Sequence, residues 1–118
     1  MMGWTGDLWW KKRIYMARIK AKERATKLNI PFDIDSADLV RLYEDSGGTC
    51  ALSLIPFRQT TNPGRADIMS ISIDRVRPEH GYVRGNVRLV LHGLNALKGM
   101  GTDEELTEIC KAVAKANE

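Results

Sequence analysis

The chain has 118 residues, a formal net charge of +3 and a sequence pI near 9.0, so it is long enough for one domain with a small core. Hydrophobic residues make up 43% and charged residues 28% of the chain, which excludes wholesale disorder, and no apolar run approaches the roughly 20 residues that a membrane helix needs. Because Lys11, Lys12 and Arg13 directly follow two tryptophans, the N-terminus also lacks the apolar centre of a signal peptide, and we expect a single domain, residues 1–118, in the cytoplasm.

Basic residues are concentrated at the N-terminus. Residues 1–27 hold eight Lys and Arg against two acids, whereas residues 28–118 hold ten against thirteen. Apolar side chains recur at helical spacing in this segment and predict a helix with one narrow apolar stripe. The stripe consists of Trp10, Ile14, Ala17, Ala21, Ala25 and Leu28. Residues 1–28 therefore predict a basic helical arm, which suits an anionic partner such as nucleic acid and equally a solvated helix face.

A second helix and a strand are predicted next. The residue before a proline avoids the α region, so Ile30-Pro31 ends the first helix. Asp35-Ser36 offers an N-cap for the second helix, and Gly47-Gly48 stops it. We interpret the short apolar run of residues 50–57 as a strand.

Two β-rich runs follow, joined by a loop. Apolar and polar residues alternate over residues 69–74, which is typical of a half-buried strand, and residues 87–91 form the second run. The loop contains Pro78, Gly81 and Gly85. An antiparallel hairpin with a long connection is therefore predicted.

Two helices are predicted at the C-terminal end. Residues 92–99 form a short one, and Thr102 and Glu105 form a capping box that starts the last helix, residues 102–116. We expect its inward side to consist of Leu106, Ile109, Cys110 and Val113. The succession of helices, strand, hairpin and helices predicts an α+β fold.

The two cysteines do not suggest a metal site. Neither Cys50 nor Cys110 belongs to a Cys/His cluster with the spacing of zinc ligands, so we expect no structural zinc. They could form one disulfide, but two buried thiols are the simpler expectation in a chain without an export signal.

The hairpin and the helix after it bring oxygen ligands together. Asp74 ends the first strand, and Asn95 lies on the helix that follows the second. Mg²⁺ keeps several waters and accepts substrate phosphate, so one carboxylate and one amide oxygen suffice as protein ligands. An ion held there would stabilise the leaving oxygen of a phosphodiester.

The stretch SIDRVRPEHGYVRGNVRLVLHGLNALKG, residues 72–99, resembles the ββα-metal core of HNH (His-Me finger) endonucleases. More narrowly, the chain is similar to small HNH proteins of phages and prophages, in which RAT, IPFD and GGTCALS segments precede the core. Here these are residues 24–26, 30–33 and 47–53, and the resemblance covers roughly residues 20 to 115. Leu54 occupies a position where this group often has glycine.

The resemblance implies a DNA endonuclease with an HNH-like core over residues 47–99 and one Mg²⁺ or Mn²⁺. Asp74 and Asn95 would bind the ion. Asn86 would hold the loop in shape, and Lys98 would face substrate phosphate.

Arg75 stands where most HNH enzymes have the histidine that activates water. Arginine stays protonated, so it would grip the phosphate instead of accepting a proton. The base would then be His80, His92 or Tyr82, or water activated by metal and phosphate alone. We place His80 first, because its loop lies beside Asp74 in the sequence.

The expected substrate is double-stranded DNA in a bacterial host. Its phosphates would meet Lys20, Lys22, Arg24, Lys27, Arg84 and Lys98. Two other hypotheses remain open. The chain could bind nucleic acid on an HNH scaffold with weak or no catalysis, or it could be a protein-interaction module whose basic arm docks onto an acidic partner.

Overall fold

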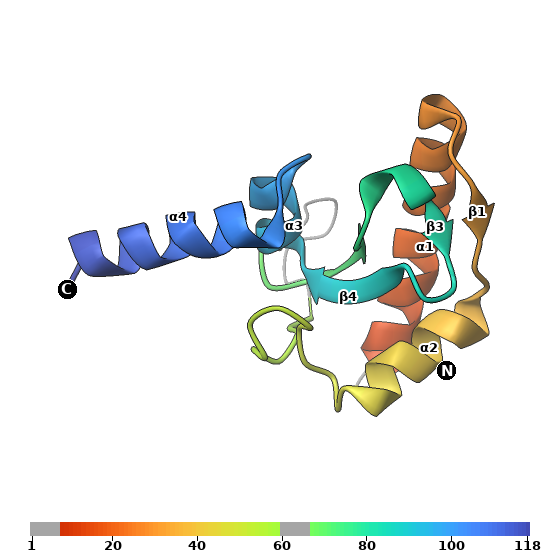
Figure 1. The fold of residues 1–118 in the computed structure, drawn as a ribbon. Helices are drawn as coiled ribbons and strands as arrows, with labels where there is room; N and C mark the ends of the chain where they lie inside the picture. The colour runs from red at the N-terminus through yellow and green to blue at the C-terminus, as the bar shows by residue number, and fades with distance from the viewer. Residues whose placement is uncertain (1–7, 60–66) are drawn as a thin grey trace.

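Helices and short strands alternate along the chain (Figure 1). The computed structural model describes residues 8–59 and 67–118; the first seven residues of the predicted basic arm lie outside the described residues. The elements are α1 (Trp9–Leu28), β1 (Phe32–Asp33), α2 (Ser36–Asp45), β2 (Ile71–Arg75), the 3₁₀ turn η2 (Pro78–His80), β3 (Tyr82–Val83), β4 (Val87–Leu91), α3 (His92–Lys98) and α4 (Asp103–Ala116). The fold is α+β, as predicted.

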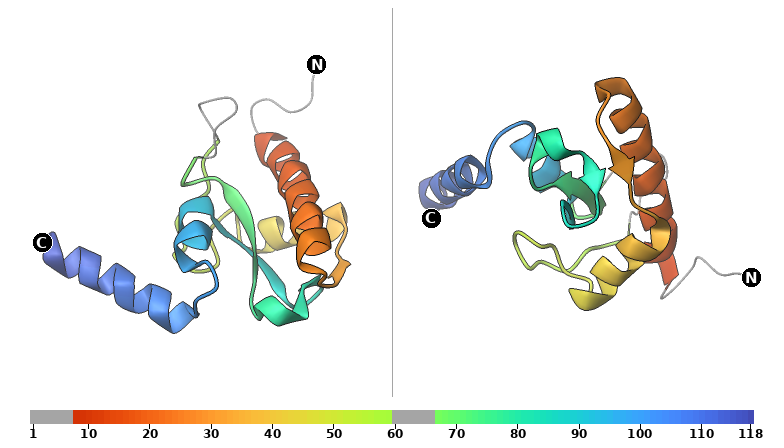
Figure 2. Two further views of the ribbon diagram at one scale, coloured as in Figure 1. Left: turned by 90° about the horizontal axis from the view of Figure 1, so that it is seen from above. Right: turned by 45° about the vertical axis from the view of Figure 1, so that its right-hand side comes forward.

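The predicted hairpin forms the centre of the molecule. β2 and β4 pair antiparallel, from Ile71 opposite Leu91 to Arg75 opposite Val87. Because side chains alternate along a strand, Ile71 and Ile73 point into the core while Ser72 and Asp74 point to the other side. α1 and α3 lie on opposite sides of this hairpin (Figure 2).

The basic helix is a wall of the domain and not a free arm. α1 ends at Leu28, as predicted, and buries Ile14, Ala17, Ala21 and Ala25 in the core. Trp10 also stacks on Tyr43 of α2, with ring centroids 4.2 Å apart. The helix turns out of the α conformation at the left-handed Asn29. The alanines matter because small side chains let a helix approach a strand closely.

A parallel strand pair joins the end of α1 to the hairpin loop. Phe32 of β1 lies opposite Tyr82 of β3, and the Tyr82 amide donates to the carbonyl of Pro31 at 2.9 Å. Gly81 makes this approach possible, because a Cβ there would come within 2.4 Å of the Pro31 carbonyl oxygen. The sequence contains no recognisable signal for strands of two residues.

The strand predicted over residues 50–57 is wrong. The Leu54 amide donates to the Cys50 carbonyl at 2.8 Å and the Cys50 amide to Ile55 at 2.9 Å, which closes a compact turn. Leu54 adopts a left-handed φ of 63°, a conformation that favours glycine. The apolar run is therefore a turn with a buried thiol at its base.

The last helix is capped as predicted, but its apolar stripe is not covered. Thr102 and Glu105 form the capping box, and Leu106 is buried. Beyond it α4 extends away from the rest of the chain (Figure 1), so Ile109, Val113 and Cys110 are exposed. The expectation that these three point inward is wrong, since periodicity marks an apolar face without saying what packs on it. No helix among the described residues is long and apolar enough to cross a membrane.

Candidate active site

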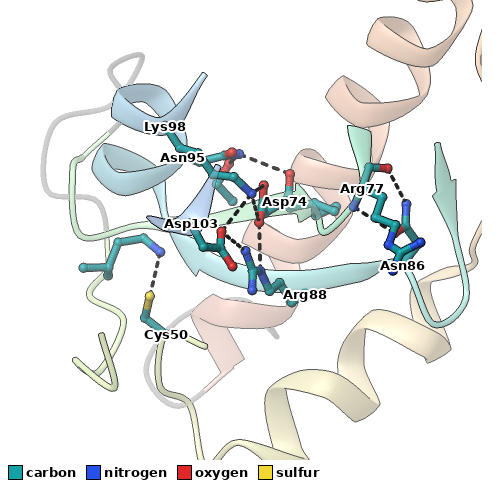
Figure 3. A network of polar contacts seen from close by, with 11 residues as sticks. Cys50, Asp74, Arg77, Asn86, Arg88, Asn95, Lys98 and Asp103 are labelled. Carbon is teal, nitrogen blue, oxygen red and sulfur yellow. Dashed lines mark hydrogen bonds and ion pairs between the residues drawn. The ribbon is translucent and has the colours of Figure 1, made fainter. Parts of the chain in front are cut away.

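Asp74 is buried between two cations. It lies in β2, opposite Arg88 of β4, and only 5% of its surface is exposed. Arg88 Nε donates to Asp74 Oδ2 at 2.8 Å. Lys98 Nζ, on α3, lies 3.2 Å from Oδ1 and 3.1 Å from Oδ2 (Figure 3).

Asp103, the first residue of α4, completes this network. It accepts from Arg88 Nη2 at 2.7 Å and pairs with Lys98 Nζ at 3.2 Å. The hydrogen bond from Arg88 holds the pKa of the Asp103 carboxyl below its ordinary value. Burial alone would lower the pKa of Arg88, but its bonds to both carboxylates outweigh burial and raise it. We call these residues the paired cluster: Asp74, Arg88, Lys98 and Asp103.

Asn95 projects from α3 towards the same strand. Its Nδ2 donates to Ser72 Oγ at 2.7 Å and to the Ile73 carbonyl at 3.1 Å. These bonds fix the amide plane, and none of the hydrogen bonds found among the described residues uses its Oδ1. An oriented amide oxygen without a donor is suited to a cation.

The loop after β2 is held by Asn86 and by Arg75. Asn86 Oδ1 accepts from the Arg77 amide at 3.0 Å, and its Nδ2 donates to the carbonyls of Arg77 and Gly81 at 3.0 and 2.7 Å (Figure 3). Arg75 donates from Nη1 to the Pro78 carbonyl at 3.1 Å and stacks over the Tyr82 ring. Asn86 thereby fixes the loop, and Arg75 keeps its place next to Asp74 in the pocket lining.

A pocket of about 380 Å³ runs between α1, β2 and α3. Asp74 and Asn95 are among its lining residues, as are four cations. We call these four the open cluster: Arg13, Lys20 and Arg24 of α1 and Arg75 of β2. In residues 8–59 and 67–118 none of the four forms an ion pair. Positive charge that converges on a pocket and is not paired with a carboxylate is suited to an anionic ligand.

The two histidines occupy different surroundings. His92 lines the pocket, where burial first and then the charges of Arg13 and Lys20 lower its pKa. The His80 side chain is 53% exposed, pairs with Glu79 at 3.8 Å and is not part of the pocket lining. Tyr82 also lines the pocket, and burial raises its pKa. Proximity to Asp74 in the sequence therefore does not bring His80 into the site.

The basic residues expected to bind DNA divide into three groups: those that line the pocket, those that are exposed outside it, and those that are paired with an aspartate. Lys20 and Arg24 line the pocket, while Lys22 and Lys27 are exposed on α1 outside it. Arg84 is held by Asp38 at 2.9 Å. The Lys98 side chain is only 3% exposed and contacts Asp74, so it does not face solvent where a phosphate would approach.

Three charged residues of the site were not anticipated. Arg13 could have been found, because residues 13, 20 and 24 fall on one line of a helix with 3.6 residues per turn. Arg88 follows from the hairpin register, which sets it opposite Asp74. Asp103 gives no such signal, since its position depends on how α4 leaves α3.

The donor set fits one hard divalent cation. Asp74 Oδ1 accepts only from Lys98, so it retains lone-pair capacity, and Asn95 Oδ1 adds a neutral oxygen. The described residues contain no group of three or more His, Cys, Asp or Glu that could hold a metal. The oxygens of Asp74 and Asn95 would match an ion that takes few protein ligands and completes its shell with water and phosphate.

The fold is similar to that of a solved structure. No family model and no curated protein matches the sequence. Among solved structures, the rare-cutting HNH restriction endonuclease PacI matches with a TM-score of 0.62 and 22% identity, over 87% of this chain and 78% of that one. The chain thus has the fold of an HNH endonuclease, with a ββα core built from β2, β4 and α3.

Proposed function

We propose that the chain is a metal-dependent endonuclease that hydrolyses phosphodiester bonds of double-stranded DNA. The observation that carries this proposal is the pocket itself. One wall offers the oxygens of Asp74 and Asn95, and the α1 wall offers cations that form no ion pair among the described residues. The HNH endonuclease fold supports the same reading.

Asp74 and Asn95 would hold the divalent ion, which supplies charge to stabilise the leaving oxygen. Arg75 binds the scissile phosphate, because its guanidinium is always protonated and is kept in place by Pro78 and Tyr82. The protein thus contributes an oriented set of charges where negative charge develops.

His92 is the better general base. It lies in the pocket, and its lowered pKa keeps the imidazole neutral and able to accept a proton at neutral pH. His80, the choice favoured by sequence, is directed to solvent. Replacing His92 by Gln should lower the cleavage rate about 100-fold, and the matched change His80→Gln should leave it within a factor of two or so.

The direct test is cleavage of supercoiled plasmid with Mg²⁺ and, separately, Mn²⁺. Wild type should nick or linearise the plasmid, and Asn95→Ala should not, since it removes a ligand without removing a charge. Asn117→Ala, an exposed amide at the end of α4, is the matched control. Equal cleavage by wild type and a folded Asn95→Ala would contradict the proposed site.

Asp74→Ala is a poor reporter in this assay. Removal of the carboxylate leaves Lys98 and Arg88 with only Asp103 as counter-charge, so lost cleavage would also follow from lost folding. Asp74→Asn, checked for an unchanged circular dichroism spectrum, is the better variant.

One observation favours a second candidate function, DNA binding with little hydrolysis. Both oxygens of Asp74 are already in contact with cations, and an incoming metal ion must compete with them. Under this alternative wild type would bind duplex DNA with steep salt dependence and leave the plasmid intact with either metal.

A further inference from the structure

Three basic residues of α1 form a row along the pocket. Arg13, Lys20 and Arg24 are spaced by seven and four residues, so they share one side of the helix next to the buried Ala17 and Ala21. The row is about 16 Å long at 1.5 Å per residue. It therefore spans more than one phosphate of a nucleic acid strand.

Arg13 is the member whose hydrogen-bonding groups are least satisfied. Its Nε is buried without a hydrogen-bond partner, the one such side-chain atom among the described residues. Burial lowers the pKa of its guanidinium, because the charged form loses solvation there. An unpartnered buried donor destabilises the fold unless a ligand supplies the acceptor.

Arg18, five residues further along the same helix, shows the contrast. Its Nε donates to the Ile34 carbonyl at 2.9 Å, and its guanidinium lies over the Phe32 ring. The fold thus provides a hydrogen-bond acceptor for Nε of Arg18, which packs against the core. It provides none for Nε of Arg13, which lines the pocket.

We propose that Arg13 and Lys20 form a second phosphate subsite, on the α1 wall of the pocket beside His92, for a DNA phosphate next to the one that Arg75 binds. This inference rests on the proposed function and adds to it a contact on the flanking backbone. The subsite is independent of base sequence, because every nucleotide has the phosphate and the nearby lining residues Ala17, Ala21 and Ala96 have no side-chain group that can hydrogen-bond to a base. A planar guanidinium suits two oxygens of one phosphate.

This arrangement accounts for the closeness of the α1 wall to the hairpin. A strand that enters between α1 and α3 passes the row on one side and Asn95 on the other. Movement of the Arg13 guanidinium towards a bound phosphate would give Nε the acceptor that the protein does not provide. α1 is therefore part of the catalytic pocket and not only a guide for the DNA backbone outside it.

The test measures DNA affinity in the absence of cleavage. A fluorescein-labelled duplex is titrated with wild type, Arg13→Gln and Lys12→Gln in a chelator, at several salt concentrations, with anisotropy as the readout. Lys12 is the matched control, since it is exposed on the same helix and loses the same charge. Arg13→Gln should weaken binding about tenfold and reduce the slope of log K against log salt by about 0.9, the value for one phosphate contact. Lys12→Gln should weaken binding less than about twofold, as expected for a distant screened charge.

Equal losses in the two variants would overturn the subsite, because general charge on α1 would then explain both. Unchanged binding by Arg13→Gln would overturn it as well. If wild type itself fails to bind DNA at low salt, the proposed function fails, which is a different outcome. Thermal unfolding guards against a folding artefact: Arg13→Gln should melt at or above the wild-type temperature, since it removes a buried unsatisfied donor.

Discussion

Charged side chains are paired with opposite charges on one side of β2 and not on the other. In the paired cluster, towards α3 and α4, each carboxylate contacts both cations at 2.7 to 3.2 Å. In the open cluster, towards α1, four cations line a pocket and form no ion pair with any described carboxylate. The first arrangement contributes to the integrity of the fold, whereas the second holds positive charge ready for a ligand. Substitutions on the two sides should therefore change different quantities.

The largest effect is expected from Asp74→Ala. Loss of this carboxylate leaves Lys98 and Arg88 with only the half-exposed Asp103 as counter-charge, and breaking a buried pair costs about 3–5 kcal/mol of unfolding free energy. Urea denaturation measures it. Asp45→Ala, at the exposed end of α2, should change stability by less than about 0.5 kcal/mol. Similar losses of unfolding free energy in Asp74→Ala and Asp45→Ala would contradict the structural role assigned to the paired cluster.

Lys98→Met should have an intermediate effect. The methionine fills the space of the buried stem, and Arg88 still contacts both carboxylates. We therefore expect a loss of about 1–3 kcal/mol from the contacts of Lys98 with Asp74 and Asp103. The same urea experiment on Lys111→Met, on exposed α4, serves as the control. An unchanged denaturation midpoint for Lys98→Met would show that the contacts of Lys98 with Asp74 and Asp103 do not stabilise the fold.

Asp103 should make stability depend on pH in the acid range. Because Arg88 lowers the pKa of Asp103 from 3.8, the folded state favours the charged form. The added stability is fully present above the unfolded pKa and is lost as pH falls through the lower folded value. Asp103 is partly exposed, so the contribution is about 1 kcal/mol or less. The difference in unfolding free energy between wild type and Asp103→Asn should shrink below about pH 4, and a pH-independent difference would contradict this assignment.

The open cluster should respond to anions, with the smallest effect. The double variant Arg13→Gln, Lys20→Gln should differ from wild type by less than about 0.5 kcal/mol in chloride, because no ion pair is lost. Sulfate at about its dissociation constant should stabilise wild type by about 0.4 kcal/mol more than the variant. Melting temperatures in sodium sulfate and sodium chloride of equal ionic strength measure this, and the variant cancels the general salting effect of sulfate.

Local signals in the sequence predicted most helix ends and the hairpin. β4 has the expected bounds, and α1 and α4 end at the expected residues, since each depends on periodicity or on caps such as Thr102 with Glu105. The turn at Cys50 and the β1–β3 pair were not predicted. An apolar run of eight residues is ambiguous, and two-residue strands exist only because Gly81 and Pro31 meet across the fold.

The site could be predicted only in part, for a similar reason. Asp74 and Asn95 lie on the strand and the helix where the sequence places them. Whether a basic residue meets phosphate or carboxylate depends on partners that periodicity does not reveal. Arg84 is held by Asp38, 46 positions away, and Lys98 by Asp74, 24 positions away. The sequence favoured His80 over His92 as the residue of the site. In the structure η2 directs His80 to solvent, whereas His92 lines the pocket.

The β1–β3 pair has a consequence for how the protein is made. It joins residue 32 to residue 82, and the pocket also needs Asn95 of α3, whereas its α1 wall is synthesised first. Such non-local contacts form late in folding. A nascent chain on the ribosome therefore carries the exposed basic face of α1 long before the opposite wall exists. The pocket can therefore assemble only after α3 has been synthesised.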